Sequence, residues 1–347
     1  MTVDELMKQV EAQMTGDAEA DIKKINEIAT DLKKEPNVEE LVSALADRAY
    51  QLLPPEKQKY MQEATFVDGV RMDKAFHNAM EALKANNLDE AERILALISN
   101  TIHEHFEQGD TKWYSFRNPF EYHLFLEFYP TIREFERAPF DFAHYLTMYG
   151  YVLLEQKKSP AIAAEAVERG IAFNPVNADY RFELAEICKF GNTPDNLLHV
   201  CQDTLRVCTS ADRIARTLCN MGYYCNMIGA YQDAGTFYFE SIRFKQSKAV
   251  EFELQDVVKH MKALGQSFVP PTHGQILDCY EKYGLVIPPN DDVVNLAITL
   301  GESAQEYNRP ELVGLFYRIA YDLTNEPKFL AIVKAMDEKI GQSKQQA

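Results

Sequence analysis

Residues 221–242 read MGYYCNMIGAYQDAGTFYFESI, and two helical patterns meet in and around this stretch. Before the turn, Leu218, Gly222 and Cys225 recur every three or four residues, the spacing that places side chains on one face of a helix. After the turn, Ala234 begins a second pattern with the same period. Two helices can cross closely only where a side chain is small, so we expect Gly222 to face the second helix near Ala234.

The same pattern of large and small residues recurs along the chain. In neighbouring stretches Gly150 and Ala185 take the place of Gly222, at separations of 35 and 37 residues. Weaker copies are centred on Ala79 and Gly301. Self-similarity at such a period is typical of a helical repeat protein, in which each unit covers the apolar face of its neighbour.

These motifs resemble the tetratricopeptide repeat (TPR) family, whose period is about 34 residues. The resemblance covers about residues 70–330. It implies an α-solenoid of stacked antiparallel hairpins, whose concave face is lined mainly by the first helix of each pair. It also implies a function in protein recognition.

An all-α chain with two regions is expected. Only 15 Gly and 15 Pro occur in 347 residues, which disfavours tight β-turns. Residues 1–64 carry amphipathic helical patterns and are expected to form an N-terminal helical bundle or cap. Residues 65–347 are expected to form the TPR-like repeat domain, with its clearest repeats over 145–247 and degenerate repeats over 72–140 and 248–330.

Residues 113–151 hold 14 of the 39 aromatic side chains, and three prolines divide the segment into short pieces. Two interpretations stay open. The segment is either an irregular core between helical units or a partly exposed aromatic surface that anchors a peptide.

Charge and composition exclude several classes of partner. The formal net charge is −17 and there is no basic run, so neither nucleic acid nor an anionic membrane is an expected partner. No stretch has the apolar length of a transmembrane helix, and the first residues do not read as a signal peptide. The six cysteines form no C-x-x-C and are expected to be reduced, as in a cytoplasmic protein.

Positions of each first helix that are not used for packing should face the groove and bind a protein or peptide. Amides there can bond a peptide backbone, and an arginine can take a carboxylate. The predicted groove residues are Tyr151, Phe182, Glu186, Lys189, Arg216, Asn220, Tyr223 and Asn226.

A catalytic alternative depends on histidines. His103 and His105 are two residues apart, so on a helix they point in different directions, unlike the pair in H-E-x-x-H. With His123 they could form a metal cluster. No phosphate-binding, dinucleotide-binding or nucleophile-elbow motif occurs, so no cofactor and no catalytic residue are expected.

Three functions therefore remain. The chain is expected to be a non-catalytic adaptor or scaffold. The alternatives are a ligand-sensing regulator that acts through protein contacts and a metal-dependent hydrolase. A homo-oligomer stays possible.

Overall fold

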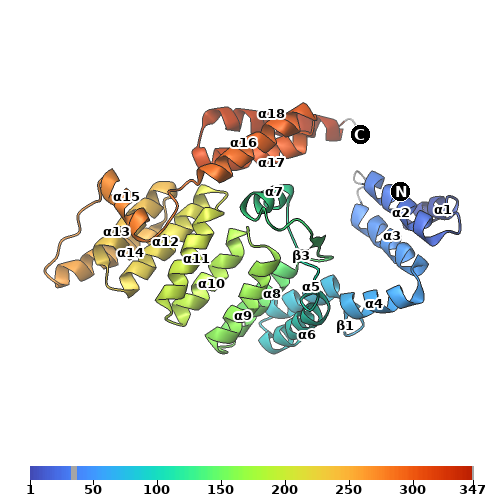
Figure 1. Ribbon diagram of the computed structural model, residues 1–347, viewed down its shortest axis with the longest axis horizontal. Coiled ribbons are helices and arrows are strands. Elements are labelled where there is room, and N and C mark those ends of the chain that lie inside the picture. The colour runs from blue at the N-terminus through green and yellow to red at the C-terminus, as the bar shows by residue number, and fades with distance from the viewer. Residues whose placement is uncertain (33–36, 346–347) are drawn as a thin grey trace. The chain divides into compact units, whose positions relative to one another are not determined.

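The fold is all-α, as the composition predicts, and the computed structural model describes residues 1–32 and 37–345 (Figure 1). The helices are α1 (Val3–Glu11), α2 (Ala18–Asp31), α3 (Val38–Leu52), α4 (Pro55–Thr65), α5 (Met72–Lys84), α6 (Leu88–Phe106), α7 (Pro119–Phe128), α8 (Phe142–Glu155), α9 (Pro160–Phe173), α10 (Ala178–Phe190), α11 (Pro194–Arg206), α12 (Ala211–Met227), α13 (Tyr231–Phe244), α14 (Lys248–Ala263), α15 (His273–Lys282), α16 (Asp291–Glu306), α17 (Pro310–Thr324) and α18 (Pro327–Gln345). Four two-residue strands accompany them: β1 (Phe66–Val67), β2 (Val70–Arg71), β3 (Trp113–Tyr114) and β4 (Glu136–Arg137). The chain divides into two compact units, Met1–Lys74 and Ala75–Ala347.

The first unit has a small core of its own, built by α1, α2 and α3. Leu6, Ile25 and Leu41 lie fully buried in it. The hydroxyl of Thr2 accepts a hydrogen bond from the backbone N–H of Glu5, and the Glu5 carboxylate accepts one from the Thr2 N–H. This capping box satisfies two otherwise unpaired donors at the start of α1. Helix α4 and the antiparallel β1–β2 pair complete the unit.

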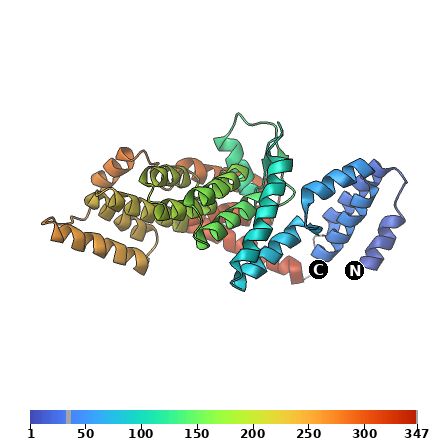
Figure 2. The same cartoon turned by 90° about the horizontal axis from the view of Figure 1, so that it is seen from below.

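The second unit contains a row of antiparallel helical hairpins, seen from the front and from below in Figures 1 and 2. From α8 to α14, each helix packs against the next one in the chain. The first helices of successive hairpins, α8, α10 and α12, also contact one another. This packing is that of a TPR-like α-solenoid.

Glycines mark the helix crossings inside the hairpins. A Cβ on Gly222 would lie 2.6 Å from the ring of Tyr238 on α13. The expected contact is therefore with the correct helix, but one turn beyond Ala234. Gly150 and Gly301 make equally close approaches to Val167 and Tyr317. The small residue leaves the space that the larger side chain of the second helix occupies.

The turns inside the hairpins share one geometry. The backbone is left-handed at Lys157, Asn192 and Gly229, with φ near +55° at the first two and +77° at the glycine. In each case the following N–H donates to a carbonyl five residues back, as Thr193 does to Cys188. This is the Schellman arrangement, which satisfies the last carbonyls of the first helix.

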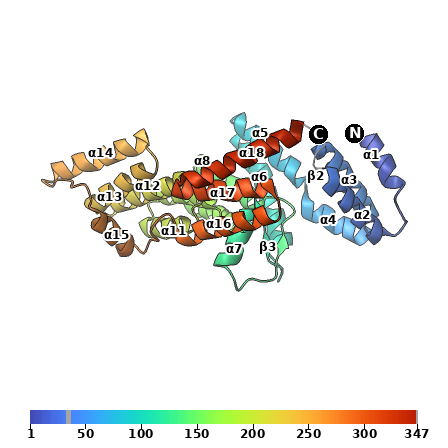
Figure 3. The same cartoon turned by 90° about the horizontal axis from the view of Figure 1, so that it is seen from above.

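The C-terminal helices pack back onto earlier helices of the second unit. Helix α16 contacts both α17 and α7, and the rings of Phe316 and Phe120 are 6.2 Å apart. The side chain of Asn290 donates to the carbonyl of Arg206 at 2.9 Å. Figures 1 and 3 show α16–α18 along the edge of the row beside α7. The C-terminal helices thus cover one edge of the solenoid.

The aromatic segment is mainly core. Phe120, Phe125 and Phe142 are almost fully buried. The ring of Phe125 lies 4.4 Å from that of Tyr114, within a larger group of edge-to-face and tilted pairs. The parallel β3–β4 pair holds the segment together. These observations favour the first of the two interpretations.

Candidate protein-binding surface

Three of the predicted groove residues meet on α10 and α12. The guanidinium of Arg216 lies over the ring of Phe182, 4.3 Å from its centroid. Phe182 is only 2% exposed, so it supports Arg216 from beneath and offers no surface itself. Nη2 of Arg216 is 3.9 Å from the Glu186 carboxylate. The stacking on Phe182 holds the cation toward solvent, where a partner can reach it.

The neighbouring turn extends this arrangement. Nζ of Lys189 is 2.9 Å from the Glu186 carboxylate and 5.3 Å from the centroid of the Tyr223 ring. The Glu186 and Arg216 side chains are 43% and 48% exposed, whereas that of Lys189 is 18% exposed. One carboxylate therefore lies between two cations on a solvent-facing surface. The name first-helix face is used below for the surface of α8, α10 and α12 that carries Tyr151, Glu186, Lys189, Arg216 and Tyr223.

On the α8 side the face is more acidic. Burial raises the pKa of the Tyr151 hydroxyl, and the carboxylates of Glu155 and Glu183 raise it further. Burial also raises the pKa of Glu183, although the nearby charge of Arg216 opposes this effect. The half-buried Glu183 carboxylate on α10 thus lies near enough to Tyr151 and Arg216 for their charges to affect one another. Sequence reasoning missed Glu183, although it lies one helical turn before Glu186 and therefore shares its side of α10.

The remaining predicted residues differ in accessibility. Asn226 is exposed and Tyr223 is partly exposed. Asn220 is 3% exposed, so it does not present its amide to a partner. Burial raises the pKa of the neighbouring Cys219 thiol, which keeps it protonated and poorly nucleophilic.

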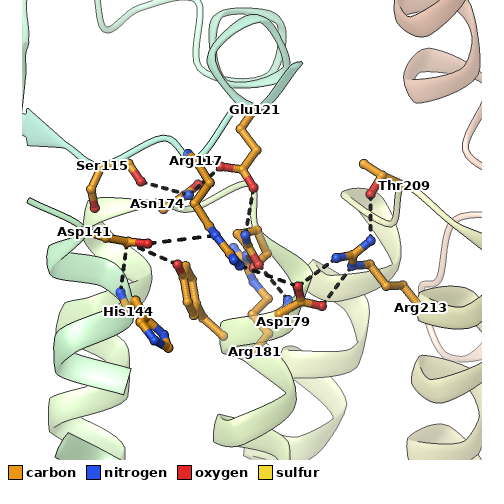
Figure 4. Close-up of polar contacts among 12 residues, drawn as sticks. Ser115, Arg117, Glu121, Asp141, His144, Asn174, Asp179, Arg181, Thr209 and Arg213 are labelled. Atoms are coloured by element: carbon orange, nitrogen blue, oxygen red, sulfur yellow. Dashed lines mark hydrogen bonds and ion pairs between the residues drawn. The ribbon is translucent and has the colours of Figure 1, made fainter. Parts of the chain in front are cut away.

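A polar cluster beside α7 positions the first helices (Figure 4). The Glu121 carboxylate accepts hydrogen bonds from the N–H of Arg117 at 2.7 Å and from the amides of Asn174 and Asn177 at 2.8 and 2.7 Å. Glu121 is 7% exposed, so these three donors replace the water that a buried carboxylate loses. The start of α7 is thereby joined to the loop before α10.

The same cluster ties α10 to α12 and α8. The guanidinium of Arg213 forms a two-pronged pair with the Asp179 carboxylate, at 2.9 and 2.7 Å. The guanidinium of Arg117 lies about 4 Å from the carboxylates of both Asp141 and Asp179. Asp141 in turn accepts from the N–H of His144 and caps α8. These pairs set the relative positions of the helix starts, and therefore of the side chains on the first-helix face.

The histidines of the catalytic alternative have ordinary surroundings. His103 is bonded to Glu107 at 2.8 Å. Burial lowers the pKa of His123, on α7. No group of three or more His, Cys, Asp or Glu side chains among the described residues could hold a metal ion.

Comparison with known proteins identifies no relative at the level of sequence. No family model matches the chain. No curated protein matches it either. Among solved structures, the chain is similar to one described as the functional characterization of PilF from Pseudomonas aeruginosa. The sequence identity is 12% and the TM-score 0.39, over 77% of this chain and 97% of that one. These values are too low to transfer residue roles. The TPR-like fold is supported instead by the packing of the chain's own helices.

The next property of the helices is their fit to a membrane span. In residues 1–32 and 37–345, none combines the length and the apolar composition that crossing a bilayer needs.

Proposed function

We propose that this chain is a non-catalytic interaction module that binds a polypeptide segment along the first-helix face. The observation that carries the proposal is the group of charged and aromatic side chains that contact one another across α10 and α12. Glu186 and Lys189 on α10 contact Arg216 and Tyr223 on α12, and on α8 the Tyr151 hydroxyl senses the charge of Glu183 from α10.

The extent of the first-helix face, which crosses the neighbouring helices α8, α10 and α12, favours a polypeptide over a small metabolite. Packed helices lie about 8–10 Å apart, so a ligand that crosses from α8 to α12 spans about 20 Å. An extended chain covers that distance with about six residues. Aromatic and arginine side chains in the centre of such a face are typical of protein-recognition surfaces.

The charge of the face supports the same class of partner. Lys189 and Arg216 both lie beside the Glu186 carboxylate. If a carboxylate of the partner binds Arg216, Glu186 keeps Lys189 as its partner, and no charge is left unpaired. The six unpaired cysteines, five of them buried, support a reducing compartment such as the cytoplasm.

A selected peptide provides the direct test. A random peptide library displayed on phage is enriched on the full chain, and the enriched sequences are synthesised. We expect the double variant Arg216→Ala/Tyr223→Ala to bind them at least about tenfold more weakly, a loss of about 1.4 kcal/mol. Fluorescence anisotropy with labelled peptide measures the affinity.

A matched control uses the same residue types elsewhere. Tyr307 is 75% exposed and Arg318 is 55% exposed at its side chain, and neither belongs to the first-helix face. The variant Tyr307→Ala/Arg318→Ala should bind like the wild type. Equal binding by all three proteins would show that the peptides use another surface and would end the proposal.

A further inference from the structure

A cleft lies on the other side of α10, between the outer helices α9 and α11. Its volume is about 620 Å³, within the range of about 300–1,000 Å³ that small-molecule sites occupy. Leu184 and Ile187 of α10 form an apolar floor, and Ala161 and Ala164 of α9 line one side. The first-helix face does not include these residues.

One charged side chain, Arg181, lines the floor of this cleft. It is 6% exposed, and its guanidinium nitrogen Nη1 is 3.5 Å from the carbonyl oxygen of Asn177. The nearby Tyr129 side chain favours its charged form. No carboxylate lies within salt-bridge distance of it in the described parts of the chain.

Other partly buried arginines of this chain are paired. Arg169 bonds the Glu107 carboxylate at 3.0 and 3.1 Å, and Arg213 bonds that of Asp179. A buried cation without a counter-ion is costly, because neutral partners replace only part of its lost hydration. Burial accordingly lowers the pKa of Arg181, but an arginine stays protonated at neutral pH. Arg181 is therefore a buried cation without an ion-pair partner among the described residues, at the floor of an open cleft.

The carboxylates of the cleft lie at its rim. Glu168 and Asp203 are exposed and line it together with the exposed His199. The charge of Asp203 partly offsets the effect of burial on the pKa of Arg181, but neither carboxylate forms an ion pair with it. They do oppose the entry of a ligand that carries several negative charges.

We propose that this cleft binds a small organic monocarboxylate, with its carboxylate on Arg181 and its apolar body against Leu184 and Ile187. The planar guanidinium matches a carboxylate with two parallel hydrogen bonds. The apolar floor takes a hydrocarbon or aromatic body, and the acidic rim disfavours phosphates and other polyanions.

Defined probes test the site on the full chain. Octanoate and 3-phenylpropanoate are compared with their primary amides, which have the same shape but no charge. We expect each carboxylate to raise the melting temperature of the wild type and to bind saturably in calorimetry. Each amide should bind at least tenfold more weakly.

Two variants separate charge from shape. Arg181→Met keeps a long side chain and removes the charge, so it should abolish the effect of the carboxylates. Without ligand it should be at least as stable as the wild type, because an unpaired buried cation is lost. Ala161→Trp keeps Arg181 but narrows the cleft, and should weaken binding at least tenfold. Arg206→Met, outside the cleft, serves as the control and should bind normally.

Several results would overturn the proposal. One is the absence of any carboxylate effect on the wild type at 10 mM, and another is equal binding of the amides. Undiminished binding by Arg181→Met would place the carboxylate elsewhere. A less stable ligand-free Arg181→Met protein would show that its own chain satisfies Arg181, which would then have a structural role only.

Discussion

Gly222 sits where α12 crosses α13, and the Tyr238 ring occupies the space that a Cβ would need. Tyr238 is fully buried, so its ring has little freedom to move aside. Single atoms at such crossings decide how closely two helices pack, because interiors are as dense as organic crystals.

Gly222→Ala should therefore destabilise the protein. Overpacking a dense core typically costs about 1–3 kcal/mol, which exceeds the gain in helix propensity. Urea unfolding measures the change. Gly274→Ala is the control, since a Cβ there meets nothing within 4 Å and the free energy of unfolding should stay equal or rise. A Gly222→Ala protein as stable as the wild type would show that Tyr238 can move.

Asp233 forms a second site where one side chain joins two helices. Its carboxylate accepts hydrogen bonds from Nζ of Lys282 and the hydroxyl of Tyr283, both at 2.6 Å. Burial alone would raise the pKa of Asp233, but these bonds outweigh it and the pKa is lowered. The carboxylate form is thus favoured in the folded state.

Asp233→Asn should lower the free energy of unfolding by about 1.5–3 kcal/mol at neutral pH, the usual value of hydrogen bonds to a charged group. A depressed folded-state pKa gives stability above the unfolded pKa of about 3.9, and this stability is lost as the pH falls through the lower folded value. Urea titrations at several pH values should therefore show the two proteins converging below about pH 4. Asp256→Asn, at an exposed pair, is the control. A difference that persists unchanged at low pH would contradict this assignment.

At the scale of the helices, the position of a helix in the row determines how many neighbouring helices stabilise it. Helix α12 packs against α11 and α13 and also contacts α10, whereas α14 packs against α13. Beyond α14, the loop to α15 lies on α13, where the Phe268 ring meets Gly235 and Gln232 bonds the backbone of Val269. Stability in a repeat array depends on such neighbour contacts.

We expect the amides of α14 to exchange with solvent at least about tenfold faster than those of α12, because local opening there breaks fewer contacts. Hydrogen exchange followed by mass spectrometry measures both helices in one sample, so α12 is the internal reference. Equal protection would mean that α14 opens only when the whole unit unfolds.

For the second unit as a whole, the helical row has two different sides. The first helices present charged and aromatic side chains that are paired among themselves, while the cleft between α9 and α11 has an apolar floor with one unpaired cation. The C-terminal helices α16 and α17 cover the edge of the row at α7. Both proposed sites share α10, which is held at its start by the Asp179–Arg213 pair.

The periodicity around Gly222 was sufficient to predict helical hairpins and their stacking. These features depend on neighbours three or four residues apart or on the next repeat, and such local relations are visible in one chain. Helix α4 is less easily recognised in this way, because its apolar pattern is weak and Ala64 is its buried residue.

Only the tertiary structure decided the rest. The burial of Asn220, the support of Arg216 by Phe182 and the return of α16 to α7 depend on residues that are distant in sequence or on which neighbour fills a space. The unpaired state of Arg181 is the clearest case. A sequence shows that an arginine is present, but whether it has a counter-ion depends on every segment that folds around it.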